Sequence, residues 1–201
     1  MVPKTLTDYI QRSTEDDNIR QALLALITQR DKRDMNHLQP FALADEWILN
    51  RDAVLASFIK GCEVGLFSLH WRTHCTRCGA FMDNGEHIHH LSDQETCMKC
   101  GNDYKSFLDE NVEVSFSVVS RFSSSKFHFF RRLPLQSAPS DVRVTGVDCL
   151  LSPVFAEVFH DQTLSESESL SIRHITLLFT DIVDSTRIYA THGDIPAQPS
   201  Q

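Results

Sequence analysis

Two short cysteine motifs organise the middle of this chain: Cys75-Thr-Arg-Cys78-Gly and Cys97-Met-Lys-Cys100-Gly, called here the first and second knuckle. Two cysteines on one tight turn can share a metal ion, and the 18 residues between the knuckles suffice for a hairpin that brings them opposite each other. The glycine after each pair permits the left-handed turn that directs backbone N–H groups towards the sulfurs. The pattern predicts a structural zinc site of the ribbon type with these four cysteines as ligands.

Two disulfides or four unreactive core cysteines are the alternatives for the same residues. The N-terminus lacks the apolar segment of a signal peptide, which favours a reducing cytoplasm and argues against disulfides. The remaining cysteines, Cys62 and Cys149, stand among apolar residues, so we expect them to be small core side chains.

Histidines offer a further set of metal ligands: His74 precedes the first knuckle, and His87, His89 and His90 lie between the knuckles. A site with three cysteines and one histidine, or a second ion, is therefore conceivable. Four cysteines already close a tetrahedral site, however, and the three histidines fall where the tip of the hairpin is expected, exposed to solvent. A closed site leaves no position for water, so we expect a structural role and no catalysis there.

The composition is that of a globular protein, with 201 residues, 41% hydrophobic and 23% charged. The formal net charge of −8 argues against a broad surface for nucleic acid or anionic lipid. The sequence contains no run of about 18 apolar residues, so it predicts no membrane span.

Residues 1–69 are expected to form a helical module that resembles a winged helix. A capping segment after Ser13 precedes an apolar helical pattern, Pro40 opens a short helix, Asn50 caps the next one, and Gly61 and Gly65 end it. An extended segment follows, which completes a helix-turn-helix and strand outline. Residues 1–60 hold eight Lys/Arg and nine Asp/Glu, so this module lacks the basic surface that DNA binding requires.

The zinc ribbon is expected at 70–110, and an antiparallel β extension at 111–160. Val112, Val114, Phe116 and Val118 alternate with polar residues, which predicts a strand with one buried face. Further strands are expected around Phe127, Phe129, Val142 and Val144, then a helical turn within 150–159 that packs on the sheet. A polar linker covers 161–173, beginning near Gln162. The fold class is therefore α+β.

The C-terminal stretch runs His174-Ile-Thr-Leu-Leu-Phe-Thr-Asp-Ile-Val-Asp-Ser-Thr-Arg-Ile-Tyr-Ala-Thr-His-Gly-Asp194. Its apolar start predicts a buried strand that ends at Asp181, and Asp184 opens a short helix. A carboxylate at a strand end beside a helix N-terminus suits a metal ion with a polyphosphate. The plainer interpretation of Asp181 is a helix cap or turn residue.

This stretch resembles the opening of the catalytic domain of class III adenylate/guanylate cyclases, which begins with a similar Phe-Thr-Asp-Ile-Val run. The preceding part is similar to an uncharacterised zinc-ribbon domain found ahead of some bacterial cyclase domains. The features that carry the second resemblance are Ala44-Asp-Glu-Trp47, Arg51-Asp-x-Val54-Leu55, Gly65-Leu66, Leu69-x-Trp71, the two knuckles and Asn111-Val-Glu-Val-x-Phe116.

The cyclase resemblance implies roles for five residues. Asp181 and Ile182 match the first ligands of the catalytic Mg²⁺ or Mn²⁺ pair, and Asp184, Ser185 and Thr186 match the turn that holds the nucleotide triphosphate. The second metal-binding aspartate of the family has no counterpart before Gln201, which predicts a truncated catalytic start at 174–201 without activity of its own, because two-metal catalysis needs both ions.

The functional expectation is a cytoplasmic regulatory or assembly region of a nucleotide cyclase, with zinc as structural support. Its expected partners are a second copy of the chain or an intact cyclase homologue. No membrane segment is expected. The alternative is a zinc-ribbon and helix-turn-helix module that binds nucleic acid or another protein.

Overall fold

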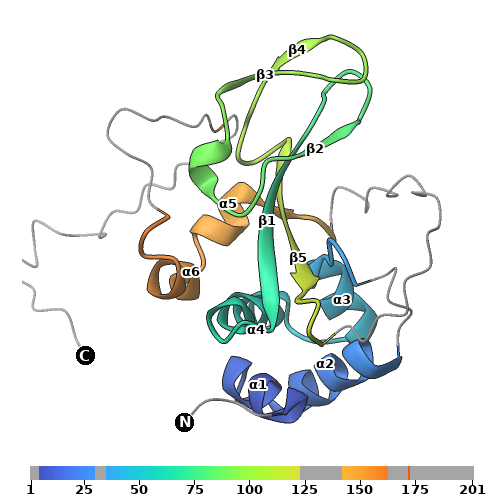
Figure 1. The fold of residues 1–201 in the computed structure, drawn as a ribbon, viewed down its shortest axis with the longest axis vertical. Coiled ribbons are helices and arrows are strands. Elements are labelled where there is room, and N and C mark those ends of the chain that lie inside the picture. Colours follow the sequence, from blue (N-terminus) through green and yellow to red (C-terminus); the bar gives the residue numbers. More distant parts are fainter. Residues whose placement is uncertain (1–4, 30–34, 123–141, 163–171, 173–201) are drawn as a thin grey trace, which may run out of the picture.

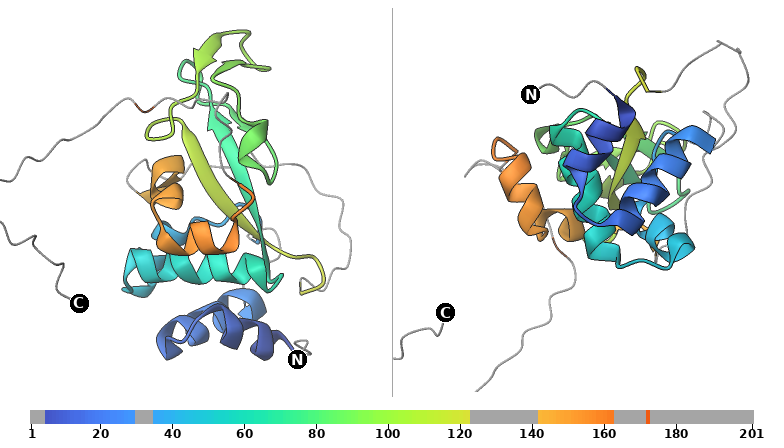
Figure 2. Two further views of the ribbon diagram at one scale, coloured as in Figure 1. Left: turned by 90° about the vertical axis from the view of Figure 1, so that its left-hand side faces the viewer. Right: turned by 90° about the horizontal axis from the view of Figure 1, so that it is seen from below.

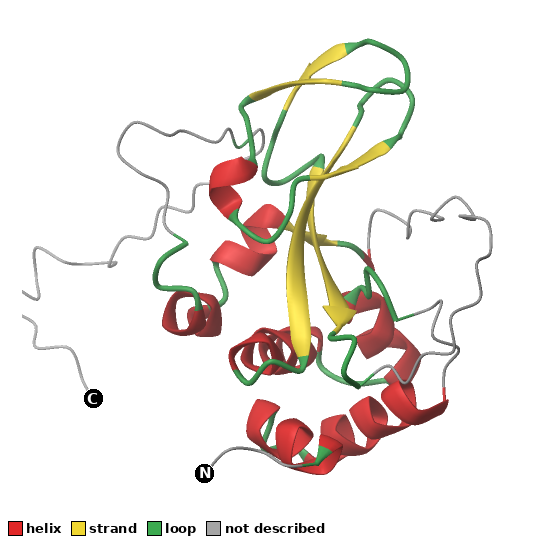
Figure 3. Cartoon of the chain, viewed as in Figure 1, coloured by secondary structure: helices red, strands yellow, loops and turns green. Residues whose placement is uncertain are grey.

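The computed structural model describes residues 5–29, 35–122, 142–162 and 172, and these form a mixed α+β fold (Figure 1). Figure 3 distinguishes its helices from its strands. In chain order the elements are α1 (Leu6–Ser13), α2 (Asp17–Gln29), α3 (Pro40–Trp47), α4 (Arg51–Glu63), β1 (Phe67–His74), β2 (Phe81–Asp83), the 3₁₀ helix η2 (Ile88–His90), β3 (Gln94–Thr96), β4 (Asp103–Lys105), β5 (Val112–Val118), β6 (Val144–Thr145), α5 (Gly146–Leu150) and α6 (Pro153–Val158).

Two long antiparallel strands, β1 and β5, form the centre of the fold. They pair along nearly their whole length, with Leu69 opposite Phe116, in a four-stranded sheet of order β2-β1-β5-β6. The strands β3 and β4 form a separate two-stranded sheet. Figure 1 places β2, β3 and β4 at one end of the long strands and α1 to α4 at the other, and the turned view of Figure 2 shows the same separation.

One face of the central sheet is apolar and packs against helices. Phe58 of α4 stacks on Phe67, with ring centroids 4.4 Å apart, and lies 5.4 Å from the ring of Phe116. On the same face, Phe155 of α6 meets the ring of Trp71 edge-on. Because these rings come from β1, β5, α4 and α6, the main hydrophobic core joins the N-terminal helices to the C-terminal ones. The domain boundary expected after residue 69 falls inside β1.

The other face of the sheet is polar and nevertheless buried. All seven residues of β5 are buried, so the prediction of a strand with one buried face was wrong. Glu113 on this face pairs with an arginine, and the hydroxyls of Ser115 and Ser117 bond to the ring and the backbone N–H of His37. Alternation shows which side chains share a face, but it does not show what covers them.

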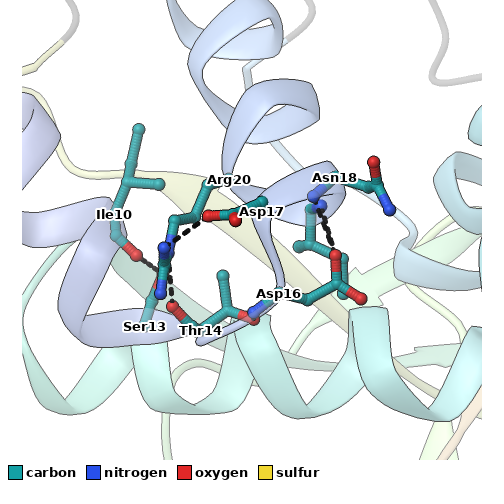
Figure 4. Close-up of polar contacts among 8 residues, drawn as sticks. Ile10, Ser13, Thr14, Asp16, Asp17, Asn18 and Arg20 are labelled. Atoms are coloured by element: carbon teal, nitrogen blue, oxygen red, sulfur yellow. Dashed lines mark hydrogen bonds and ion pairs between the residues drawn. The ribbon is translucent and has the colours of Figure 1, made fainter.

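The turn between α1 and α2 is built by side chains that bond to the backbone (Figure 4). The carboxylate of Asp16 accepts hydrogen bonds from the N–H groups of Asn18 and Ile19, which caps α2 as the sequence predicts. Arg20 donates to the carbonyl of Thr14 and pairs with Asp17 at 2.6 Å. This turn sets the angle between the first two helices.

The next two helices also begin as expected. Pro40 is the first residue of α3, and the Asn50 side chain accepts from the N–H of Ala53 to cap α4. One detail was wrong: Gly61 lies inside α4, where an added Cβ would clash with the ring of Phe67, a strand residue that packs against this helix. Gly65, with φ +77°, follows the helix.

Helix α4 lies inside the fold. Val54, Phe58 and Ile59 are fully buried, and the exposed positions include Asp52 and Lys60, of opposite charge. The helix-turn-helix order is therefore present in α3 and α4, but α4 offers no basic face to a DNA groove, and a winged-helix fold is not confirmed. Among the described residues, no helix is long and apolar enough to cross a bilayer.

The C-terminal part of the described chain packs back on the sheet. Val144 of β6 pairs with Val114 of β5. Helix α6 lies within the region 150–159 where a helical turn was expected, whereas α5 begins before that region and was not predicted. Gln162 is buried, so it is not part of a polar linker as predicted. The strands expected around Phe127 and Phe129 lie outside the described residues.

Candidate metal centre

The first knuckle is the turn between β1 and β2. Cys75 follows the last residue of β1, and its backbone N–H donates to the carbonyl of Ala80 at 2.9 Å. Gly79 donates its N–H to the carbonyl of Cys75 at 2.8 Å and has φ +66°. Nothing lies within 4 Å of a Cβ built on Gly79, so the glycine meets a conformational need and not a steric one.

The second knuckle repeats this geometry between β3 and β4. Cys97 donates its N–H to the carbonyl of Asn102 at 2.9 Å, and Gly101, with φ +67°, donates to the carbonyl of Cys97 at 2.8 Å. Each knuckle therefore ends its own hairpin. The spacing predicts one hairpin with both knuckles at its base, and that detail was wrong because β2 pairs with β1 while β3 pairs with β4.

The two knuckles bring four sulfurs together. All four Sγ atoms lie within 4.8 Å of one another, with Cys75 to Cys100 at 3.7 Å and Cys78 to Cys97 at 3.6 Å. A tetrahedral ion with metal–sulfur bonds of about 2.3 Å would separate its ligands by about 3.8 Å. The donor set therefore fits one tetrahedral ion that prefers sulfur ligands.

The two sides of this cluster differ in exposure. Cys75 and Cys97 are buried, whereas Cys78 is half-buried and Cys100 is exposed. The backbone N–H of Cys100, followed by that of Lys99 and the neighbouring thiols, lowers the pKa of Cys97 to about 6. Backbone donors aimed at a sulfur favour the thiolate, which is the form that binds metal.

The four candidate histidines stand outside this cluster. His87, His89 and His90 are exposed in or beside η2, in the connection between β2 and β3. The ring of His74 lies 3.4 Å from an Arg143 nitrogen, and burial, with that arginine, lowers the pKa of His74 to about 4. The group of potential metal ligands formed by the described residues contains the four cysteines alone.

Two polar residues that were not predicted to be part of the site tie the centre to the sheet. The Tyr104 hydroxyl is 3.1 Å from that of Thr73, and the Tyr104 ring packs with Cys75 and Cys97. Buried Asn111 donates to the carbonyls of His74 and Lys105. The position of Tyr104, shortly after the second knuckle in an otherwise polar strand, is the sequence feature that could have indicated its role.

The residues expected to hold a catalytic metal and a triphosphate lie outside the described part of the chain. These are Asp181, Ile182, Asp184, Ser185 and Thr186.

Comparisons with known proteins give one result. Neither the curated proteins nor the solved structures include a match to this chain. The sequence profile of a family of unknown function, DUF5939, matches residues 3–180 and so covers most of the chain. The chain belongs to this family.

Proposed function

We propose that the folded part of this chain is a zinc-stabilised regulatory or assembly domain that works ahead of a class III nucleotide cyclase catalytic domain. The observation that carries the cyclase part is the resemblance of residues 174–194, including Asp181 and Asp184-Ser-Thr, to the start of such a domain. The long described segment 142–162 precedes this stretch closely along the chain.

The choice of zinc rests on the donor set. Four cysteine sulfurs at 3.6–3.7 Å across the closest pairs suit a d¹⁰ ion that accepts tetrahedral thiolates. When bound, zinc would be held by Cys75, Cys78, Cys97 and Cys100 and would supply structural stability. Four protein ligands leave no open position for water or substrate, which supports a structural role.

The zinc part is tested by metal analysis of the purified chain. We expect about one zinc ion per chain in the parent protein and much less in a Cys97→Ser/Cys100→Ser variant. Cys149→Ser is the matched control, since Cys149 is buried in the main core and belongs to no group of ligands among the described residues. Equal zinc in both variants would exclude the four-cysteine site.

The regulatory part is tested by cyclic nucleotide assays with Mg²⁺ or Mn²⁺. We expect the chain to alter the rate of an intact cyclase that carries the same kind of N-terminal domain, because both would offer the same assembly surfaces. The Cys97→Ser/Cys100→Ser variant should lose this effect while Cys149→Ser keeps it. An unchanged rate at a large excess of the chain would contradict the proposal.

A module for nucleic-acid or protein interaction is the second candidate, and one observation favours it. The tips of the two knuckles expose Arg77, Met98 and Lys99, with Met98 90% accessible. Cations beside an apolar side chain can contact phosphates or an acidic protein surface. Nucleic-acid binding that weakens with salt and is lost in an Arg77→Ala/Lys99→Ala variant would favour this candidate over the first.

A further inference from the structure

Gln162 stands at the end of the last long described segment, and its side chain is clamped. It is 5% exposed, and its amide makes three hydrogen bonds. The Oε1 atom accepts from the indole N–H of Trp71 at 3.1 Å and from the backbone N–H of Ile88 at 3.2 Å. The Nε2 atom donates to the carbonyl of Glu86 at 2.9 Å. We call these three bonds the Gln162 clamp.

The partners of the clamp lie far from Gln162 in sequence and belong to two different parts of the fold. Trp71 is a fully buried residue of β1 in the main core. Glu86 and Ile88 lie in the connection between the two knuckle hairpins, and the Ile88 side chain reaches the same core. A buried amide whose polar atoms are all paired holds its side chain firmly against its partners, because each lost hydrogen bond leaves a buried polar group unsatisfied.

The connection between the hairpins is bonded to β1 and is linked to the metal centre through Thr73 of that strand. Its residue Asn84 donates its backbone N–H to the carbonyl of Trp71 at 2.8 Å, and its side-chain oxygen is 3.5 Å from the hydroxyl of Thr73. That hydroxyl is also 3.1 Å from Tyr104, whose ring packs on Cys75 and Cys97. A continuous series of contacts thus leads from the sulfurs to the clamp.

The metal end of this series has little apolar support of its own. Its hydrophobic cluster contains Cys75, Cys97 and Tyr104, with Cys78 and Ala80 at its edge, so most of its members are the proposed ligands. Loss of the ion would leave four thiols in place of a core, and the ribbon should open while the main core persists.

We propose that the Gln162 clamp couples the metal state of the four-cysteine centre to the position of Gln162, the last residue of the long described segment 142–162. With zinc bound, the hairpin connection holds the Gln162 side chain against Trp71. Without zinc, the connection loosens and the clamp opens. The regulatory meaning of this coupling rests on the proposed function, but the coupling itself is a property of the described fold.

The test observes the Trp71 indole N–H by ¹H–¹⁵N NMR of the full chain, with the resonance assigned through Trp71→Phe. Removal of zinc by a chelator should shift this resonance and speed its hydrogen exchange about tenfold or more, the factor expected when a buried hydrogen bond is lost. Readdition of zinc should reverse both changes. The indole of Trp47, on α3, is the internal control and should stay unchanged.

A Gln162→Met variant completes the experiment, since methionine keeps much of the volume but supplies no amide. Its Trp71 resonance should already be shifted with zinc bound, and the chelator should add little further change. If zinc removal alters the Tyr104 signals but leaves the Trp71 indole of the parent protein unmoved, the coupling is overturned. This readout needs no cyclase activity, so the coupling and the proposed function can fail separately.

Discussion

The buried ion pair between Arg72 and Glu113 gives the sharpest prediction for stability. An Arg72 guanidinium nitrogen lies 2.9 Å from a carboxylate oxygen of Glu113, and the two side chains are only 6% and 4% exposed. Arg143 stands 4.0 Å from the other oxygen. Burial raises the pKa of Glu113 and lowers that of Arg72, so each charge depends on its partner.

Replacing Arg72 of this pair should lower the free energy of unfolding by a limited amount that depends on pH. In Arg72→Met the buried carboxyl can take up a proton, and at pH 7 this costs at most about 3.4 kcal/mol, since each pH unit above the ordinary pKa of 4.5 costs about 1.4 kcal/mol. The folded-state pKa is then raised above the unfolded one, so stability is lost as pH rises above 4.5. At pH 5.5 the limit falls to about 1.4 kcal/mol. Loss of the Arg72 contact over the Phe81 ring adds about 0.5–1 kcal/mol at both pH values.

Breaking the pair from the carboxylate side should destabilise more. Arg72 cannot release its proton, so Glu113→Leu leaves a buried cation that should lower the free energy of unfolding by about 3–5 kcal/mol at either pH. The double variant Arg72→Met/Glu113→Leu should recover most of the loss, because apolar residues often replace a buried pair without destabilising the fold.

Urea unfolding of the zinc-loaded protein, followed by tryptophan fluorescence at pH 7 and 5.5, measures all three variants. The control is Asp45→Asn, which breaks the Arg51–Asp45 pair of 2.6 Å on a surface where both side chains are over 40% exposed. We expect only a small, salt-dependent change there. A double variant whose loss of unfolding free energy equals the sum of the two single losses would refute this account. So would an Arg72→Met variant that loses the same unfolding free energy at both pH values.

Three further predictions concern the metal, two glycines and one histidine. Chelation should raise hydrogen exchange across residues 75–105 while α1 to α4 stay protected, because only the ribbon depends on the ion; loss of protection throughout would contradict this. In urea unfolding, Gly79→Ala should cost about 1 kcal/mol because of its φ of +66°. Gly146→Ala should cost about 1–3 kcal/mol, because its Cβ would lie 2.6 Å from a Leu108 methyl and 3.2 Å from the Leu108 carbonyl; the reverse order would count against the geometry. Burial, and then Arg72, lowers the pKa of His37 from 6.5 to about 4, so the folded state binds fewer protons and stability should fall as pH drops through that window. His37→Asn, which tolerates the φ of +53°, should flatten this slope in thermal unfolding measured from pH 7 to 4.

Local chemistry explains what the sequence predicted well. Asn50 and Pro40 act within one helical turn, and the cysteine pairs act within one tight turn, so spacing alone indicates the structure. The strand at Val112–Val118 follows from period-two alternation for the same reason. The coming together of two knuckles 18 residues apart could be predicted because only one arrangement satisfies four thiolates on one ion.

Pairings over long distances explain what could not be predicted. The Gln162 amide meets Trp71 across 91 residues, and the polar face of β5 is buried by contacts that include His37, 78 residues before Ser115. Nothing near Gln162 in the sequence distinguishes it from a linker residue. The two separate hairpins were missed because a cysteine spacing fixes the ligand set but not which strands pair.

The two cores of this fold differ in the side chains that stabilise them. The main core buries large rings such as Phe58, Trp71 and Phe116, and this burial of apolar surface stabilises the fold without a metal ion. The ribbon buries mostly cysteine sulfurs, so with the proposed metal bound its stability would follow the supply of the ion and the redox state of the thiols. The hairpin connection is part of both, since Ile88 belongs to the main core while Asn84 bonds towards Tyr104 through Thr73. Under the proposed coupling, a change at the sulfurs would reach Gln162 through this connection without unfolding the helices.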